Sequence, residues 1–571
     1  MKHSVKYIAS LLAMLYMGAM ECDAKVTLPR ILSPGMVVQR EHPVVLWGKA
    51  DPGETVTVKI TDSRNKTVGP RKGISVTAGD DGQWRAEYSE LKAGGPYTIT
   101  INDITIDNVL SGDVYLFSGQ SNIDLTVGRV TDMFADEIAS YSNDKIRHFN
   151  VPNAYEFHQP LDDVKNCTWQ PTTDEQLMAF SALAYFFSKE LNERTGLPVG
   201  IIRSSWGGTP IESWIKEERL AEFPGLVNKK RIYEDDAYRN RINQLAGESS
   251  ARRQSLLYAT DPGLHDAVKW YEPAFDDSDW PTVEIPSGSV TDGTIAGDDI
   301  HCGWKAADGW ATDGLNPVNG SHWFRKTVSL PSSMAGKPGL LRLGCIVDAD
   351  SVYVNGTFVG TVSYQYPPRK YPIPAGLLKE GDNQITIRLF SNGGRANFVP
   401  EKPYKLIAGD EEINLEGAWK YHRGAVVPPV QGGVSFNYIP AVLYNAMIHP
   451  IINYPVNGVV WYQGESNVDT RNSYTYMLKT LMDSWRADFN DRDMPFYIVE
   501  LADFLHKDDR GGRAAWAEMR RNQAEAAKST HNAYLVPNSD LGEWNDIHPL
   551  DKKTVGHRVV EAVIKHNEIK K

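Results

Sequence analysis

The segment VYLFSGQSNIDL, residues 114–125, joins a short apolar run to a turn of small polar residues. Residues 114–117 are apolar and rich in β-forming types, which predicts a buried strand. Ser121 follows this strand, and the amides of Ser121 and Asn122 can point toward one spot beside its hydroxyl. An exposed hydroxyl and nearby amide donors are two requirements of a serine nucleophile. The segment therefore predicts Ser121 as a nucleophile at a strand end.

An ordinary polar turn is the alternative interpretation of these residues, because Gly, Ser and Asn are common turn formers. The G-x-S-x-G pattern of many serine hydrolases is also incomplete, since Ile123 stands where its second glycine would be. Catalysis at Ser121 therefore depends on partner residues elsewhere in the chain.

The length and composition predict a globular protein of several domains. The chain has 571 residues, of which 41% are hydrophobic and 23% charged. The net charge of -12 argues against a surface that binds nucleic acid or anionic membranes. The chain has 15 Trp and 26 Tyr, and we expect most of them to pack in β-sheet cores.

The N-terminal segment, residues 1–24, has the pattern of a secretory signal peptide. A basic start and an apolar stretch at residues 7–20 come before small residues that end at Ala24, where cleavage is expected. A lipid-anchored Cys22 is the alternative, although Glu21 stands where that signal needs a small residue. No later stretch is long and apolar enough to span a bilayer. We expect an exported protein, periplasmic or extracellular.

Three cysteines, Cys167, Cys302 and Cys345, remain after this cleavage. An odd number without close spacing predicts neither a disulfide framework nor a metal site of the C-x-x-C type. We interpret all three as core residues, with a bridge between Cys302 and Cys345 as the alternative.

The hydrophobic pattern changes three times along the chain. Residues 25–110 carry short alternating strands separated by Gly and Pro, which predicts an N-terminal β-sandwich. Residues 111–245 and 430–571 alternate strands with helices, as in a parallel sheet flanked by helices. Residues 246–429 return to strands, with a hairpin expected at Asn355-Gly356, and predict a second β-sandwich inserted into the α/β domain.

Individual elements of the α/β domain can also be predicted. Apolar residues recur at helical spacing over residues 174–195, and Gly196 ends that helix. The other elements expected here are strands at residues 199–202, 457–461, 496–501 and 533–536, and helices at residues 514–528 and 554–566.

Three polar clusters lie at predicted strand ends, where α/β sheets bind their ligands. The first is the glycine pair Gly207-Gly208, whose backbone N–H groups can approach a ligand closely. The second is WYQGESN at residues 461–467, in which amide side chains are neutral donors suited to an oxyanion. A flexible loop and a capped turn are the alternative interpretations of these two clusters.

The third cluster is DIHP, in which Asp546 lies two residues before His548. A carboxylate at this spacing can reach the imidazole Nδ1–H and leave Nε2 free to take a proton from a serine. A surface Asp that caps a helix, with an incidental His, is the alternative. Along this chain the serine comes first, the donors next, and Asp and His last. One class of Ser-His-Asp hydrolases has the same order.

Taken together, these motifs resemble those of bacterial sialate O-acetylesterases, carbohydrate esterases of the SGNH hydrolase superfamily. The matching motifs are GQSN at residues 119–122, SSWGGTPIESW at 204–214, WYQGESN at 461–467 and DIHP at 546–549. The resemblance covers residues 111–245 and 430–571. It implies a three-layer parallel-sheet domain with an N-terminal β-sandwich and an inserted jelly-roll β-sandwich.

The resemblance also implies roles for individual residues. Ser121 matches the nucleophile, His548 the general base and Asp546 the carboxylate that orients it. The oxyanion hole would combine the Ser121 amide, an amide of Gly207 or Gly208, and a side-chain amide for which Gln463 is favoured and Asn467 is the alternative. No metal or cofactor is implied. In the insert, Trp304, Trp310 and Trp323 either contact glycan or, as we expect for most of them, pack in the core.

The predicted reaction is the removal of O-acetyl groups from sialic acids on glycans through an acetyl-enzyme. Two alternatives are open: an esterase of another acetylated polysaccharide such as acetylxylan, and a non-catalytic glycan-binding surface protein. A glycosidase would need two carboxylates that face one bond. We expect the nearby Glu212 and Glu465 to fix loops instead.

Overall fold

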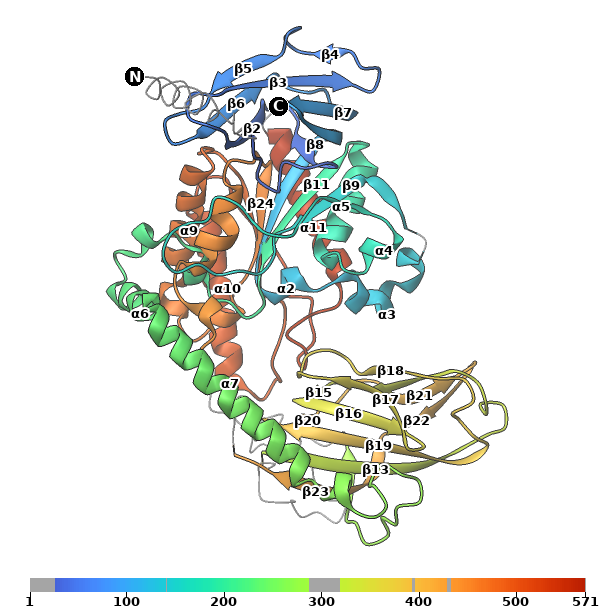
Figure 1. The fold of residues 1–571 in the computed structure, drawn as a ribbon. Coiled ribbons are helices and arrows are strands. Elements are labelled where there is room, and N and C mark those ends of the chain that lie inside the picture. Colours follow the sequence, from blue (N-terminus) through green and yellow to red (C-terminus); the bar gives the residue numbers. More distant parts are fainter. Residues whose placement is uncertain (1–25, 140, 287–318, 393–395, 429–432, 570–571) are drawn as a thin grey trace, which may run out of the picture.

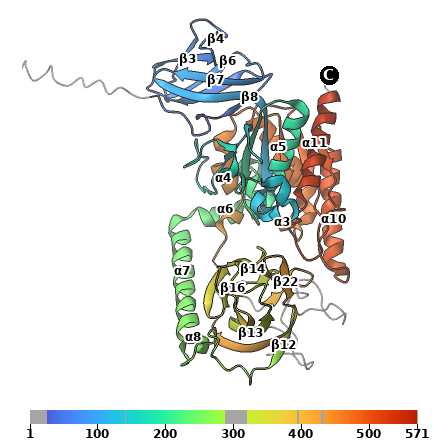
Figure 2. The ribbon, with the colours of Figure 1, turned by 90° about the vertical axis from the view of Figure 1, so that its right-hand side faces the viewer.

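A computed structural model describes residues 26–139, 141–286, 319–392, 396–428 and 433–569. Three parts are stacked from top to bottom in Figure 1: a small β-structure, an α/β part and a second β-structure (Figures 1 and 2). The α/β part lies in the middle and is built from segments on both sides of the second β-structure in sequence.

The N-terminal β-structure forms because its strands alternate buried and exposed side chains. One pairing joins β2 (Val44–Lys49) to β6 (Gln83–Tyr88), and a second group pairs β3 (Thr55–Asp62) with β4 (Thr67–Val68), β5 (Ile74–Thr77) and β7 (Gly94–Ile101). The first half of β8 (Ile104–Gly119) pairs with β7, and β1 (Val37–Gln39) pairs parallel to its middle. The strand that leads to Ser121 therefore starts in this β-structure.

The second half of β8 is the centre of the α/β sheet. In the described residues the strand order is β10-β9-β11-β8-β24-β25-β26, and all these neighbours are parallel except β10 and β9. The strands are β9 (Asn143–Asn150), β10 (Gln170–Thr172), β11 (Val199–Ser205), β24 (Gly458–Tyr462), β25 (Phe496–Val499) and β26 (Ala533–Val536). The α/β class predicted from the sequence is confirmed.

Helices cover both faces of this sheet. Phe187 of α5 (Ala182–Thr195) contacts Tyr115 and Phe117 on one face. Trp461 of β24 is in register with Ser118 and so points to the other face, where it contacts Trp485 of α9 (Tyr474–Asp488). The remaining helices of this part are α2 (Ser121–Asp124), α3 (Val127–Ile138), α4 (Asp174–Leu177), α10 (Arg510–Lys528) and α11 (Lys552–Ile569).

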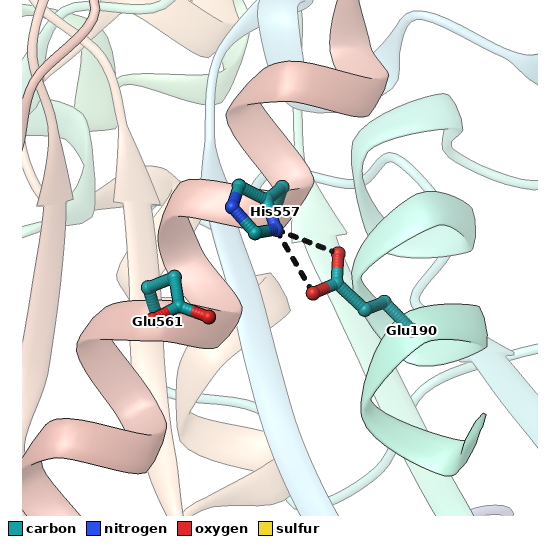
Figure 3. Close-up of side chains that lie close together, drawn as sticks. All are labelled: Glu190, His557 and Glu561. Atoms are coloured by element: carbon teal, nitrogen blue, oxygen red, sulfur yellow. Dashed lines mark hydrogen bonds and ion pairs between the residues drawn. The ribbon is translucent and has the colours of Figure 1, made fainter. Parts of the chain in front are cut away.

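A surface network joins α5 to α11. His557 Nδ1 lies 2.9 and 3.1 Å from the two carboxylate oxygens of Glu190 (Figure 3), and the guanidinium of Arg194 pairs with both Glu190 and Glu561. Glu190, His557 and Glu561 have the residue types of a metal site. Because Arg194 already neutralises the two carboxylates, we interpret the cluster as an ion-pair network between two helices.

The chain reaches the insert through α6 (Pro224–Glu234), the long α7 (Asp236–Ala259) and α8 (Pro262–His265) (Figures 1 and 2). The predicted change from helix to strands at residue 246 is wrong, because α7 continues to Ala259. Among the described residues of α7 only Leu257 is buried. A helix that is polar on nearly all sides shows no apolar stripe in its sequence.

In its described part, the insert contains a six-stranded sheet of order β12-β23-β13-β19-β16-β17, a four-stranded sheet of order β18-β14-β21-β22 and the pair β15-β20. The expected Asn355-Gly356 hairpin joins β16 to β17. The strands are β12 (Thr282–Ile285), β13 (Gly320–Leu330), β14 (Gly339–Leu343), β15 (Ile346–Val347), β16 (Ala349–Val354), β17 (Thr357–Val362), β18 (Lys370–Ile373), β19 (Gly381–Ser391), β20 (Asn397–Phe398), β21 (Tyr404–Ala408), β22 (Glu411–Asn414) and β23 (Gly417–Val426). The jelly-roll and sandwich topologies stay predictions.

Several sequence predictions concern residues outside the described ranges: the signal peptide with Cys22, and Cys302, Trp304 and Trp310. Trp323 is fully buried beside Trp270, so it packs in a core. Cys345 is buried and Cys167 half-buried. Across the described ranges, we find no helix with the length and apolar character needed to cross a membrane.

Candidate active site

Ser121 lies beyond the carboxyl end of β8, at the point where the order in which strands are added to the sheet reverses. The chain leaves β8 to build β9 and β11 on one side and later β24 on the other, which is where α/β sheets bind ligands. Gly119 makes the turn before Ser121 with a φ of +136°, and a Cβ there would stand 2.1 Å from the Tyr462 carbonyl oxygen. Only glycine fits this turn.

His548 faces the nucleophile from the loop between β26 and α11. Its Nε2 lies 2.8 Å from Ser121 Oγ, although the two residues are 427 positions apart in sequence. Burial, and then the positive charges of Lys552 and Arg129, lower the pKa of His548 to about 3. The imidazole is therefore neutral at pH 7, and Nε2 can accept the hydroxyl proton.

Asp546 lies beside His548 as the sequence predicts, but the contact is looser than a hydrogen bond. Its Oδ1 is 3.8 Å from His548 Nδ1 and instead accepts the backbone N–H of His548 at 2.9 Å. Burial raises the pKa of Asp546, and Lys402, 3.6 Å away, opposes that rise. The carboxylate fixes the loop, and a small movement of the ring would bring Nδ1 within hydrogen-bonding distance.

The Gly207-Gly208 loop lies against the nucleophile. A Cβ on Gly207 would be 3.3 Å from Ser121 Cβ, and Gly208 has a φ of +77° with the Tyr438 hydroxyl against it. Among the described residues, the N–H groups of Ser121 and Gly208 donate to no protein acceptor. The Gly207 N–H instead faces the carboxylate of Asp124. Ser121 and Gly208 are thus the amides that remain available for an oxyanion.

The structure does not bring Gln463 and Asn467 to the pocket. Gln463 is fully buried and gives its amide hydrogens to the Thr209 carbonyl oxygen at 3.2 Å and to Asn467 Oδ1 at 2.7 Å. Asn467 donates to Glu212 at 3.0 Å. These amides therefore hold the 207–214 loop in place. Glu212 accepts the hydrogen bond of Asn467 and so helps to fix this loop, as expected from the sequence.

A polar network that the sequence did not reveal lies under the nucleophile. The Asn122 side chain donates to Glu465 Oε1 at 2.6 Å and to the Ile547 carbonyl oxygen at 3.1 Å, and it accepts a hydrogen bond from Lys552 Nζ at 2.6 Å. Burial lowers the pKa of Lys552 to about 7, although Glu465 opposes that shift. The network ties the Ser121 turn to the His548 loop.

A pocket of about 820 Å³ opens above Ser121 and His548. The α/β part supplies its floor, and the insert supplies a wall that contains Tyr364 and Tyr366. The Tyr366 ring meets the His548 ring edge-on, with centroids 4.8 Å apart. Exposed tyrosines beside a nucleophile suit the faces of sugar rings, and no sequence pattern marked these two residues.

Comparison with known proteins shows the family to which the chain belongs. The family model described as "Carbohydrate esterase, sialic acid-specific acetylesterase" matches residues 111–258 and 418–565, which is about half of the chain. The chain belongs to this carbohydrate esterase family. The two matched segments flank the insert and contain Ser121, Asp546 and His548.

Individual relatives support the family assignment. A sialate O-acetylesterase of Rattus norvegicus is 31% identical over 559 residues, which are 92% of this chain and 70% of that protein. A sialate O-acetylesterase of Pongo abelii is 34% identical over 197 residues, and the chain spans only 36% of its length. The crystal structure of a carbohydrate acetylesterase from Xanthomonas citri matches 94% of this chain and 74% of that chain with a TM-score of 0.52 and 21% identity, which shows a shared fold.

Proposed function

We propose that this carbohydrate esterase removes O-acetyl groups from sialic acids by way of an acetyl-enzyme on Ser121. The observation that carries the proposal is the 2.8 Å contact between Ser121 Oγ and a buried, neutral His548 in an open pocket. The names of the relatives, sialate O-acetylesterases, favour sialic acid as the sugar. An SGNH-type fold with an N-terminal β-sandwich and a jelly-roll insert belongs to the same proposal.

The proposed reaction begins when Ser121 Oγ attacks the acetyl carbonyl carbon while His548 Nε2 takes the hydroxyl proton. The negative charge on the carbonyl oxygen is stabilised by the N–H groups of Ser121 and Gly208. When the tetrahedral intermediate collapses, His548 protonates the departing sugar oxygen. Water then attacks the acetyl-enzyme with His548 again as the base, which releases acetate. This route needs no metal ion or cofactor.

Acetate release from O-acetylated sialosides and from acetylated xylo-oligosaccharides tests the proposal. We expect the sialosides to be the better substrates and Ser121→Ala to lower kcat by at least about 10³-fold. Ser118→Ala is the matched control, because it removes a serine hydroxyl from the end of β8, three residues before Ser121, that is buried and has no hydrogen-bond partner in the described chain.

Three results would contradict parts of the proposal. Nearly full activity of Ser121→Ala would show that Ser121 is not the nucleophile. A preference for the xylo-oligosaccharides would favour an esterase of neutral polysaccharides. A protein that binds glycans but releases no acetate would be a glycan-binding protein.

We also propose that the protein is exported to the periplasm or the cell exterior. The support is the basic start, the apolar stretch and the small residues before the expected cleavage site after Ala24. N-terminal sequencing of the protein purified from its native cells tests this: a mature chain that begins at Lys25 supports export, and an intact residue 1 contradicts cleavage.

A further inference from the structure

Arg129 presents a guanidinium to the catalytic pocket without a carboxylate partner in the described chain. It lies on α3, lines the pocket together with Ser121 and His548, and is half-buried. Its Nη2 donates to the Tyr366 carbonyl oxygen at 3.3 Å, and its Nε is buried with no hydrogen-bond partner. A buried N–H group of a cation is costly to leave unpaired, so this guanidinium is prepared for an acceptor that the chain does not supply.

Asp124 and Glu465, the acidic residues that line the same pocket in the described chain, each have a positively charged neighbour. Asp124 pairs with Arg203 at 2.7 Å and also accepts the Ser205 hydroxyl. Glu465 accepts the Asn122 amide at Oε1, its buried Oε2 has no hydrogen-bond partner, and the positive charge of Lys552 favours its ionised form. Asp546 is not a lining residue of the pocket. It lies close enough to Arg129 for the positive charge to lower its pKa, but the two side chains form no direct ion pair. Among the described pocket residues, Arg129 therefore carries the charge that is left to interact with a ligand.

The position of Arg129 is fixed relative to the nucleophile. Its contact with the Tyr366 carbonyl oxygen joins α3 to the insert, and the Tyr366 ring contacts the His548 ring, which contacts Ser121. A ligand that binds the guanidinium thus lies in the same pocket as an ester on Ser121. A planar guanidinium binds a carboxylate through two parallel hydrogen bonds, which gives both affinity and orientation.

We propose that Arg129 binds the carboxylate of an acidic sugar and thereby selects sialic acid esters over esters of neutral sugars. This inference rests on the proposed function, because it names the part of the substrate that the esterase recognises. A neutral sugar would fill the pocket and leave the guanidinium unpaired and desolvated, which penalises its binding.

An O-acetylated sialic acid and its methyl ester test the proposal, because they differ in the charge of the carboxylate. The measured quantity is the ratio of kcat/KM for the free acid to kcat/KM for the methyl ester. We expect a ratio of about 10 to 100 for the wild-type enzyme, the usual value of a hydrogen bond to a charged group. In Arg129→Met we expect the ratio to fall to about 1, even if kcat/KM falls for both substrates.

Arg342→Met is the matched control. Arg342 joins the insert to α3 through Asp132, at the same boundary, but does not line the pocket. We expect it to keep the wild-type ratio. An unchanged ratio in Arg129→Met, or equal rates of the wild-type enzyme on both substrates, would overturn the inference while leaving the esterase intact. A wild-type enzyme that releases acetate from neither substrate would instead overturn the proposed function.

Discussion

His548 is held neutral by its surroundings, and this sets the expected pH dependence. Burial, with Lys552 and Arg129, lowers its pKa to about 3. In the proposed mechanism the neutral imidazole is the base, so activity is present above this pKa and is lost as pH falls through it. We predict that the acid limb of kcat/KM lies well below pH 6.5, so that activity at pH 5 is close to that at pH 7.

Acetate release from a neutral aryl acetate between pH 4 and pH 8 measures this limb. An acid limb at pH 6.5 or above would show that the imidazole is not desolvated as described.

The same pKa shift of His548 predicts that acid destabilises the folded chain. Below about pH 6.5 the unfolded chain binds a proton on His548 and the folded chain does not, so the free energy of unfolding decreases as pH falls from about 6.5 towards about 3.

Lys552 acts on the site through two contacts. It holds the Asn122 amide at 2.6 Å, and its positive charge helps to lower the pKa of His548. We predict that Lys552→Met lowers kcat by about 10-fold, because one charged hydrogen bond beneath the nucleophile is lost. We also predict that the acid limb of kcat/KM moves to higher pH, because a nearby positive charge is removed.

The neighbouring Lys553→Met is the control for this prediction, since Lys553 is exposed and pairs with Glu137. A loss of activity in Lys552→Met without a shift of the acid limb would mean that Lys552 only supports the fold. The kcat/KM profile from pH 4 to pH 8 separates the two cases.

Single residues differ in how well the sequence predicts them. Ser121, Asp546 and His548 are recognisable because their types, order and places at strand ends suit one chemistry. Gln463 and Asn467 have a suitable chemistry too, but spacing cannot show that other protein groups already use their amides. Arg129 and Tyr366 line the pocket, and Lys552 is buried against Asn122 beside Ser121. The three residues come from separate segments, so their meeting is a property of the fold alone.

At the level of elements, a loop of the insert lies against the loop that carries His548, the proposed base. Lys402 contacts both Glu543 and Asp546. Burial opposes the charge of Lys402, but these carboxylates outweigh it and raise its pKa, so the side chain is a cation at pH 7. We predict that Lys402→Met lowers kcat about 10-fold with little change in KM, because the buried Asp546 loses a positive neighbour and becomes easier to protonate.

Lys405→Met is the control for Lys402→Met, since Lys405 lies on the same insert and pairs with the exposed Glu412. Steady-state kinetics of acetate release give kcat and KM for both variants. A change in KM alone would place the role of Lys402 in substrate binding instead of in supporting Asp546.

Elements with strong local patterns were predicted well, and α7 was not. The end of α5 at an αL glycine, Gly196, is visible in the sequence and is confirmed. The single helix predicted over residues 174–195 is wrong, because the structure has α4 and α5 there with a break between them. Residues 182–188 of α5 are all buried, so burial is not limited to one face. The helix α7 spans solvent between two parts of the molecule, so nearly all of its positions are polar and its pattern resembles that of a linker.

For the whole molecule, ion pairs join the insert to the α/β part. Asp132 on α3 pairs with Arg342 at 2.5 Å and with Lys370 at 2.7 Å, and Lys402 pairs with Glu543 and Asp546. Salt at 1 M reduces the screening length to about 3 Å, which weakens such partly exposed pairs. We predict that 1 M NaCl lowers kcat/KM for a neutral aryl acetate a few-fold, without a change in far-UV circular dichroism. Asp132→Asn should lower kcat/KM at low salt and reduce the further effect of salt, because two of the pairs are already absent.

Equal rates of the wild-type enzyme at 50 mM and 1 M NaCl would mean that apolar packing, and not charge, holds the insert over the site.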